Sequence, residues 1–308
     1  MLKYLVIILS DNSVSFCNYE SGAGDGKLIS QEALYSAIRF GMKENLMMQF
    51  VFPENGIPSE HRRLIDSIDH VKIAPVSIAG KDDIGVTSSW DAFDSGVRCE
   101  TVIIHTTFGR LLDNGGVLKR ALMKLNRINV VISDIDDISD ADAARYGKWL
   151  ERLAGDLTEV ITAETGGQLN ILTDRLRLNG MRNCNAGHEA ITVAPDGHFY
   201  VCPAFYYGGE PSAGNLAEGI QLANRQLYEL KNAPICRKCD AWHCRRCVWL
   251  NKRCTKEVNI PGHLQCVLSH YERNASRLVL KNMKNLGIRH DYGEIPELKY
   301  LDPFETLI

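Results

Sequence analysis

The chain has 308 residues, a formal net charge of -3 at pH 7, and 45% hydrophobic and 24% charged residues. This composition is ordinary for a soluble globular protein, and the length allows two domains with their own cores. A nearly neutral chain offers no overall electrostatic attraction to nucleic acid or to an anionic membrane. No apolar run reaches the roughly 18 residues that suggest a membrane span. We therefore expect a cytoplasmic protein without nucleic-acid or membrane partners.

The first part of the chain alternates short apolar runs with amphipathic segments, which predicts strands alternating with helices. The expected strands cover residues 4–9, 48–52, 71–76, 101–105, 128–132 and 169–172. The expected helices cover residues 31–44, 58–69, 118–125 and 139–153. Ser30 offers an N-cap to the first helix, and Ser139 with Asp142 forms a capping-box-like start for the last. Residues 80–96 lack periodicity and are expected to be irregular.

Six strands alternating with helices imply a parallel sheet with right-handed crossovers. Six units suit an open doubly wound sheet as well as a partial barrel, and periodicity does not separate the two. In both architectures, ligands bind at the C-terminal ends of the strands. A later helix, at about 265–285, is expected to pack on the C-terminal part of the chain.

Eight of the ten cysteines are concentrated in the last third of the chain. They are Cys184, Cys202, Cys236, Cys239, Cys244, Cys247, Cys254 and Cys266. Two C-x2-C pairs, at 236–239 and 244–247, let a turn present both sulfurs to one metal centre. Eight thiolates suffice for two four-cysteine sites, which suits two iron–sulfur clusters or two zinc ions.

Disulfides are another use of an even number of cysteines, but they persist in oxidising compartments. The apolar run at residues 4–9 is preceded only by Lys3 and ended by Ser10 and Asp11. Such a run is typical of a first strand and not of a secretory signal. The sequence therefore favours metal ligation, with zinc as the alternative to iron–sulfur clusters.

The cysteine-rich stretch resembles the SPASM domain, which is appended to radical-SAM enzymes that mature ribosomally made peptides. The resemblance rests on the run Cys184-Asn-Ala-Gly187, on ITVAPDGHFYVC ending at Cys202, and on Gly214-Asn215-Leu216. The first half of the family pattern, C-x(9–15)-G-x4-C, is met in full. In the second half, the spacers after Cys239 and Cys244 are each one residue shorter than in the family.

The resemblance implies a ligand set for each of two auxiliary clusters. One set would be Cys236, Cys239, Cys244 and Cys266. The other would be Cys184, Cys202 and Cys247, with Cys254 as the candidate fourth ligand. The resemblance also favours a six-unit (β/α) partial barrel of radical-SAM type, followed by a small cysteine-rich SPASM domain. The expected divisions are a degenerate barrel at 1–178, a SPASM domain with a C-terminal packing helix at 179–285, and a tail at 286–308.

The loop after the first strand departs from the radical-SAM pattern. Those enzymes carry C-x3-C-x2-C there, and its three thiolates hold the cluster that cleaves S-adenosylmethionine. This chain has Cys17, but Ser21 and Gly24 occupy the other two positions. The family's GGEP motif would fall at residues 53–58, which read PENGIP and share little with it. We therefore expect that the SAM-cleaving cluster is lost, and assign no catalytic or SAM-binding residue.

A closer resemblance covers the whole chain. The opening MLKYLVIILSDNSVSFCNYE, the stretch RFGMKENLMMQFVFPE and the run CPAFYYGG are similar to the CXXX repeat peptide maturase family. That family implies a cysteine-rich precursor peptide as the partner, with two [4Fe-4S] clusters in the SPASM domain. The lost cluster motif leaves two alternatives open. One is a non-catalytic protein that holds the peptide for a partner maturation enzyme, and the other is a zinc-stabilised adaptor.

Two further sets of residues have a plainer interpretation. Asp134, Asp136 and Asp137 follow the fifth expected strand and could bind magnesium, but aspartates also favour the start of a helix. His243 and His263 lie among the cysteines. With eight thiolates available, we expect these histidines to lie beside the ligands or to face solvent, and not to bind metal.

Overall fold

The computed structural model describes residues 1–22, 26–162, 166–181 and 184–307. Within these ranges, nine strands form one sheet in the order β7-β6-β5-β4-β3-β2-β1-β8-β9. The strands are β1 (Tyr4–Ile8), β2 (Met47–Val51), β3 (Val71–Pro75), β4 (Ile84–Thr87), β5 (Thr101–Thr106), β6 (Arg127–Ile132), β7 (Gln168–Leu169), β8 (Ala190–Val193) and β9 (Phe199–Tyr200). A separate two-stranded sheet joins β10 (Gly214–Asn215) to β11 (Gly219–Ile220).

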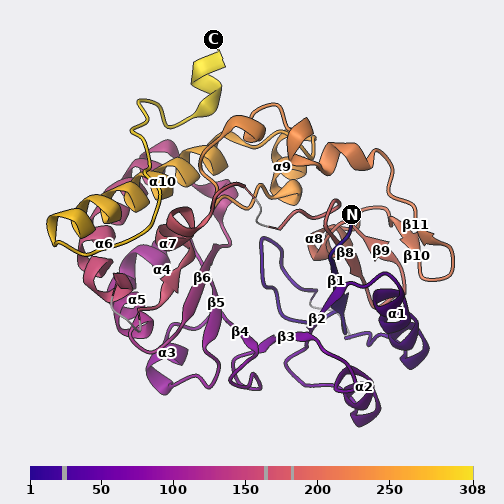
Figure 1. The fold of residues 1–308 in the computed structure, drawn as a ribbon. Helices are drawn as coiled ribbons and strands as arrows, with labels where there is room; N and C mark the ends of the chain where they lie inside the picture. The colour runs from indigo at the N-terminus through magenta and orange to yellow at the C-terminus, as the bar shows by residue number, and fades with distance from the viewer. Residues whose placement is uncertain (23–25, 163–165, 182–183, 308) are drawn as a thin grey trace.

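Helices lie outside the curved sheet, and the cysteine-rich segments lie across one end of it (Figure 1). The α-helices are α1 (Gln31–Lys43), α2 (Ser59–Ile65), α3 (Asp91–Ser95), α4 (Phe108–Asp113), α5 (Gly115–Leu122), α6 (Asp140–Thr162), α7 (Asn170–Arg177), α8 (Pro203–Tyr207), α9 (Val248–Thr255) and α10 (His263–Asn285). The 3-10 turns are η1 (Ile135–Asp137), η2 (Arg225–Tyr228), η3 (Leu230–Asn232), η4 (Cys236–Lys238) and η5 (Pro303–Leu307).

The sheet is parallel from β1 through β7, and each strand pairs with the next one along the chain. On the other side of β1, β8 is parallel to it and β9 is antiparallel to β8. This topology is the predicted α/β parallel sheet. Because β8 belongs to the cysteine-rich part, the sheet crosses the division expected at residue 178, and that division stays a prediction.

Both faces of the sheet are buried, as continuous apolar runs predict. The concave face carries one β-branched residue from each of the six long central strands. These are Val6, Val51, Ile73, Val86, Ile103 and Val131. The alternate residues, such as Leu5 and Ile104, pack under the helices in the main core. The period-2 alternation of side chains thus divides each strand between two cores.

Two sequence predictions for strands were wrong. Residues 80–96, expected to be irregular, contain β4, which has only four residues and includes Gly85. A Cβ at Gly85 would lie 2.4 Å from Cys99 Sγ, so the close packing there leaves no room for a side chain. The segment 169–172, expected to be a strand, is mostly helix α7. There the Asn170 amide hydrogen-bonds the backbone N–H and C=O of Val130, and so takes the place of a further strand residue beside β6.

The helix starts follow the predicted capping. Ser30 Oγ accepts a hydrogen bond from Ala33 N at 3.1 Å, at the start of α1. At the start of α6, Asp142 N donates to Ser139 Oγ at 3.2 Å, and Ser139 N donates to the Asp142 carboxylate at 3.4 Å. This is the reciprocal capping box that the sequence predicted. Helix α6 then continues beyond the predicted end, to Thr162.

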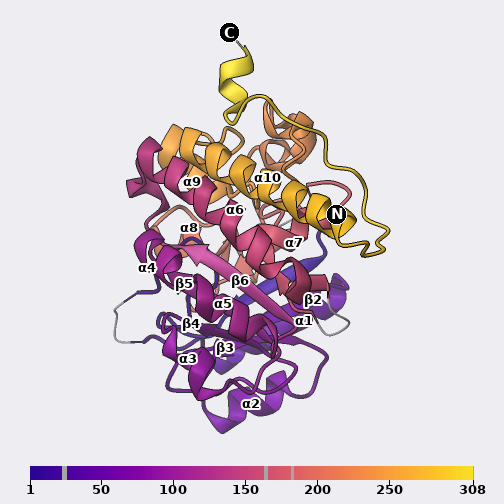
Figure 2. The same ribbon diagram turned by 90° about the vertical axis from the view of Figure 1, so that its left-hand side faces the viewer.

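Helix α10 packs along α6 and α7 and connects the cysteine-rich part to the barrel (Figure 2). The Tyr271 ring lies over Gly147, where a Cβ would be 2.4 Å from the ring. Tyr146 donates a hydrogen bond to Glu272 at 2.8 Å, and Ser276 donates to the Leu172 carbonyl at 2.8 Å. The helix therefore packs on the barrel helices as well as on the cysteine-rich segment. Across the described residues, no helix has the length and apolar character needed to cross a bilayer.

Candidate metal centres

The structure brings Cys236, Cys239, Cys244 and Cys266 around one small cavity of about 20 Å³. We name these four residues the first cysteine group. The 3-10 turn η4 brings Cys236 and Cys239 together, since Cys239 N donates to Cys236 O at 3.2 Å. Cys266 comes from the first turn of α10. These are the four residues that the SPASM resemblance assigned to one cluster.

Hydrogen-bond donors point at the sulfurs of this group. Ala241 N donates to Cys239 Sγ at 3.4 Å, and Arg246 N donates to Cys244 Sγ at 3.4 Å. His270 Nε2 lies 3.4 Å from Cys239 Sγ. Donors of this kind stabilise thiolate sulfur and tune a metal bound to it.

The electrostatics of the first group favour a bound cation. Burial, reinforced by the neighbouring thiolates, raises the pKa of Cys236 to about 12. Burial is also the main cause that raises the pKa of Cys239 to about 11, and it raises that of Cys266 further. Four adjacent thiols at such values stay protonated when no cation is present. A metal that binds them must release protons, as is usual for cysteine sites.

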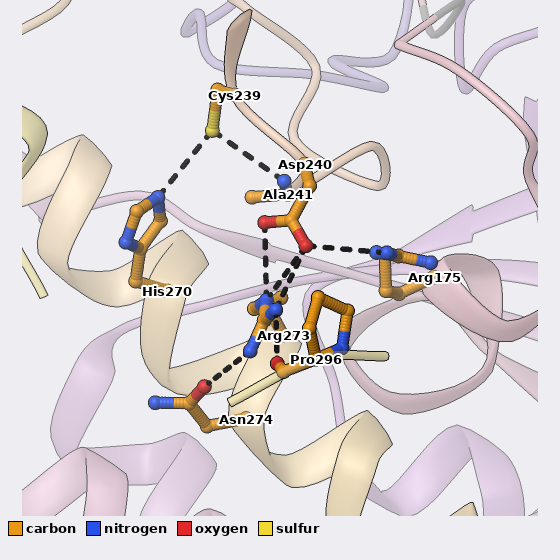
Figure 3. A network of polar contacts seen from close by, with 8 residues as sticks. All are labelled: Arg175, Cys239, Asp240, Ala241, His270, Arg273, Asn274 and Pro296. Carbon is orange, nitrogen blue, oxygen red and sulfur yellow. Dashed lines mark hydrogen bonds and ion pairs between the residues drawn. The ribbon is translucent and has the colours of Figure 1, made fainter. Parts of the chain in front are cut away.

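An ionic network holds the loop that carries Cys239 (Figure 3). The Arg273 side chain, fully buried on α10, donates from Nε and Nη2 to the Asp240 carboxylate at 3.1 and 2.8 Å. Arg175 from α7 adds a contact to the same carboxylate at 3.4 Å and lies 3.9 Å above the Trp242 ring. Burial alone would raise the pKa of Asp240, but its hydrogen bonds and charge contacts with the two arginines hold that pKa below its usual range.

The charges of three other cysteines act on Cys202. Burial raises the pKa of Cys202, and the nearby charges of Cys17, Cys247 and Cys184 raise it further. We name these four residues the second cysteine group. Cys202 and Cys247 are the N-cap residues of α8 and α9, whereas Cys184 precedes β8 and Cys17 lies in the loop after β1. The group therefore joins four segments that are far apart in the sequence.

Backbone strain is concentrated at these cysteines. Cys184 has φ of 66° and Arg246, between Cys244 and Cys247, has φ of 44°. A non-glycine residue in this left-handed region costs about 1–2 kcal/mol, and such strain clusters at functional sites. In both cases, the surrounding contacts fix a conformation that the isolated chain disfavours.

Arg246 lies between the two groups. Burial lowers its pKa, and the thiolate charges of Cys236 and Cys184, one from each group, oppose that effect. Its Nη2 donates to the Tyr228 carbonyl at 2.5 Å. Its Nη1 is buried without a hydrogen-bond partner among the described residues. A buried, unpaired cationic donor beside thiolates fits the excess negative charge of a four-thiolate metal centre.

Among the described residues, no three His, Cys, Asp or Glu side chains lie close enough together to hold one metal ion. The donors in both groups are all cysteine thiols. That donor set suits iron–sulfur clusters and also suits zinc. The kind of donor therefore agrees with thiolate ligation, and the two ligand sets and the metal stay predictions.

Cys254 lies away from this second group. It is exposed near the end of α9, and its Sγ would lie 2.7 Å from a Cβ built at Gly262. It lines a separate cavity of about 390 Å³, together with Leu250, Arg253 and His263. Its assignment as a ligand stays a prediction, and Cys184 is the other exposed cysteine of the predicted set.

The loop after β1 meets a polar cavity of about 340 Å³ at the C-terminal ends of the strands. Ser21, Glu54 and His105 are among the residues that line this cavity. Gly24, the third position of the missing cluster motif, lies outside the described residues. Burial, followed by the charge of Arg245, lowers the pKa of His105 to about 4, so His105 is neutral near pH 7.

Three cavities form a chain along α9. The 390 Å³ cavity beside Cys254, a cavity of about 100 Å³ beside Cys247 and one of about 40 Å³ beside Cys17 share Leu250 and Ile135 in their walls. The shared walls make the three cavities neighbours. They therefore lead from the surface at Cys254 toward the second cysteine group.

The acidic and histidine candidates have structural partners. Asp134 accepts a hydrogen bond from Phe108 N at 2.7 Å, and Asp136 pairs with Arg253 at 2.6 Å. His243 Nε2 lies 3.1 Å from Glu272. His263 contacts Asp302 closely and also lies 2.9 Å from Asp140. These contacts agree with the plainer interpretation of each set.

Sequence reasoning did not single out Arg246, His270 or Asn18 as site residues. His270 follows Cys266 by four positions on α10, a spacing that puts both on one helix face and could have marked it. Arg246 was one of several arginines and lysines near the cysteines, and its burial distinguishes it only in the folded chain. Asn18 lines the same cavity as Cys247, a proximity that no spacing predicts.

No family model matches the chain, and no curated protein sequence matches it. Several solved structures match the chain. The chain is similar to anSMEcpe with bound AdoMet, with a TM-score of 0.63 and 12% identity, over 94% of this chain and 96% of that one. It is also similar to anSMEcpe with bound AdoMet and the Cp18Cys peptide, with a TM-score of 0.62 and 12% identity, over 93% and 100% of the two chains.

At this level of identity, the likeness establishes the fold. The chain has the α/β fold of these structures, with the predicted parallel sheet, and the SPASM domain stays a prediction. The similarity extends over nearly the full length of both proteins. Activity does not follow from fold alone, so the function is argued from the cysteine groups and the cavities.

Proposed function

We propose that this protein takes part in the maturation of a cysteine-rich peptide, holds two [4Fe-4S] clusters in its SPASM domain, and does not cleave S-adenosylmethionine. The observation that carries the proposal is the cavity shared by Cys236, Cys239, Cys244 and Cys266, which are the four residues of one predicted ligand set. The loop after β1 has only Cys17 where radical-SAM enzymes have three cysteines.

The first cysteine group would hold one cluster through Cys236, Cys239, Cys244 and Cys266. The SPASM resemblance, the shared cavity and the donors at Cys239 and Cys244 support this assignment. A cluster bound there would supply one-electron transfer and polarisation of a nearby ligand. The protein's own contribution is to fix the sulfurs, exclude water and balance charge through Arg246.

Loss of SAM cleavage is supported by the chemistry of the barrel mouth. A cluster that binds SAM needs three thiolates, and Ser21 stands at one of those positions in this chain. Arg245, whose charge acts on both Cys17 and His105, adds a cation where a SAM-binding cluster would need thiolate ligands. The polar 340 Å³ cavity remains large enough for a small molecule.

The peptide-binding part of the proposal rests on the cavities along α9. The largest, about 390 Å³, opens at the surface and leads toward the second cysteine group. One anSMEcpe structure of the same fold holds a peptide. A peptide with cysteine at every fourth position would present its thiols along one face of a helix. Such a face could meet the wall formed by Leu250 and Ile135.

The direct test uses protein purified without oxygen and a labelled peptide with cysteine at every fourth position. Fluorescence anisotropy should show binding, and a control peptide with serine at those positions should bind at least about tenfold more weakly. Equal binding of the two peptides, or no binding of either, would contradict the proposal.

Mass spectrometry of the same mixtures separates the two candidate roles. A change in the mass of the cysteine peptide identifies a maturase. Binding without a mass change favours the second candidate, a protein that holds the peptide for a partner maturation enzyme. The missing cysteines of the β1 loop are the observation in favour of that second role.

A further inference from the structure

We propose that Cys17 is the fourth ligand of the second metal centre, with Cys184, Cys202 and Cys247, in place of Cys254. The inference rests on the proposed function insofar as it assumes a bound metal centre. It assigns the remaining cysteine of the degenerate SAM-cluster loop to a different site.

Aromatic packing sets the β1 loop against the segment that carries Cys202. Tyr19 stacks on Tyr207 of α8, with ring centroids 5.1 Å apart and ring planes 9° from parallel. Tyr207 also donates a hydrogen bond to the Ser10 carbonyl at 3.3 Å. Cys202 is the N-cap of α8. The stack therefore fixes the loop two residues from Cys17 beside the helix that starts at Cys202.

The other side of Cys17 faces the start of α9. Cys247 is the N-cap of α9, and Asn18 lines the same cavity of about 100 Å³ as Cys247. A tight turn, in which Tyr19 N donates to the Cys17 carbonyl at 2.8 Å, holds the three residues 17–19 together. Cys17 thus lies between the contacts to Cys202 and Cys247.

Helix geometry argues against Cys254. Cys247 and Cys254 lie seven residues apart, at opposite ends of α9. At a rise of about 1.5 Å per residue, they are separated by about 10 Å along the axis. Two thiolates on one zinc ion are about 4 Å apart, given Zn–S bonds of about 2.3 Å. A centre at the start of α9 therefore uses Cys247 and leaves Cys254 exposed.

The assignment accounts for the degenerate loop. A thiolate committed to the second centre is not available to a SAM-binding cluster, so cysteines at the other two loop positions would have no function there. The Cys17 thiol gives up its proton when the metal binds, as the other three ligands do. The loop after β1 thereby becomes part of the SPASM metal site and joins the barrel to it.

The test compares metal content in two single variants of the full chain, purified without oxygen. Cys17→Ala should lose about half of the iron and sulfide, because one of two clusters lacks a ligand. The matched control, Cys254→Ala, should keep the wild-type content. Cys202→Ala should reproduce the loss in Cys17→Ala, and its electronic absorption spectrum should match that variant.

Alkylation of the wild-type chain adds a test that does not depend on the folding of any variant. Cys17 should be protected from iodoacetamide in the metal-loaded protein and become reactive after chelation, whereas Cys254 should react in both states. Reactive Cys17 in the loaded protein, or full metal content in Cys17→Ala, would overturn the assignment of Cys17 but not the cluster proposal. Wild-type protein with two zinc ions would overturn the cluster proposal, and Cys17→Ala should then hold one zinc. Metal-free wild-type protein would overturn both.

Discussion

The two cysteine groups differ in how the chain assembles them. Three members of the first group, Cys236, Cys239 and Cys244, come from one short segment, and α10 supplies the fourth. The second group joins the β1 loop to three segments of the cysteine-rich part. The first group can therefore form within the C-terminal part of the chain. The second can form only after the barrel and the SPASM domain have come together.

The supports of the two groups differ in the same way. Around the first group, buried charges fix the Cys239 loop through Asp240, Arg273 and Arg175. Around the second, the Tyr19–Tyr207 stack holds the β1 loop. A change to the ionic network should act on the first group, and a change to the stack should act on the second.

The largest effect is expected from Cys239→Ala. Metal binding in such a domain contributes folding free energy, so loss of one ligand should lower the free energy of unfolding by several kcal/mol. Chemical denaturation of protein purified without oxygen measures this, and the loss should exceed that of Cys17→Ala. Wild-type stability in Cys239→Ala would mean that the first group does not bind metal.

Arg273→Met should break the ionic network. It removes a fully buried guanidinium and leaves Asp240 with Arg175 alone, so we expect a loss of about 2–4 kcal/mol in the free energy of unfolding. Arg277→Met is the matched control on the same helix, because its pair with Glu297 is exposed and should change stability by less than about 0.5 kcal/mol. Equal effects of the two substitutions would contradict the account of the network.

Tyr19→Leu should loosen the second group and spare the first. Losing the stack on Tyr207 and the hydrogen bond to the Val14 carbonyl should cost about 1–2 kcal/mol. Cys17 should then react faster with iodoacetamide, while Cys239 keeps its wild-type rate. Tyr35→Leu, at an exposed tyrosine, is the control. Faster reaction at Cys239 as well would show that the two groups are not separately supported.

The smallest expected effect is a pH-dependent change in stability at the contact between α10 and the C-terminal tail. Hydrogen bonds that His263 donates to the Asp302 and Asp140 carboxylates raise its pKa. The folded state therefore binds its proton more tightly than the unfolded state does. The resulting stability is present below the unfolded pKa of about 6.5 and is lost as pH rises through the folded value.

His263→Gln should remove this pH dependence. Since His263 is about half exposed, the contribution should stay below about 1 kcal/mol. Urea denaturation of the wild type and the variant at about pH 6 and about pH 8 measures this contribution. The gap in free energy of unfolding between the two proteins should narrow at the higher pH. A gap that widens with pH would contradict the assigned direction.

The sequence predictions that succeeded rested on patterns among residues close together in the chain. Continuous apolar runs predicted the buried parallel strands, and Ser139 with Asp142 predicted the start of α6. The C-x2-C spacing and the SPASM resemblance brought out the first cysteine group, because its members are close in sequence. Strand β4 was missed because it is short and contains Gly85. Helix α7 was predicted as a strand, and the Asn170 amide there bonds to Val130, which is 40 residues away in the sequence.

Those patterns did not predict that Cys17 belongs to the second group. Cys17 is separated from its three neighbours by the whole barrel, so no spacing relates them. The sequence argument treated Cys17 as the remnant of a lost cluster and chose Cys254 because it is near in sequence. The stack of Tyr19 on Tyr207 sets the Cys17 loop against the helix that starts at Cys202.

The central claim is that the chain holds two four-iron clusters, one in each cysteine group. The most direct measurement is the iron, acid-labile sulfide and zinc content of protein purified without oxygen. The account predicts about eight irons and about eight sulfides per chain. About two zinc ions without iron would contradict it and make the SPASM domain a zinc-stabilised structure. About twelve irons would contradict it in the other direction, by revealing a third cluster in the loop after β1.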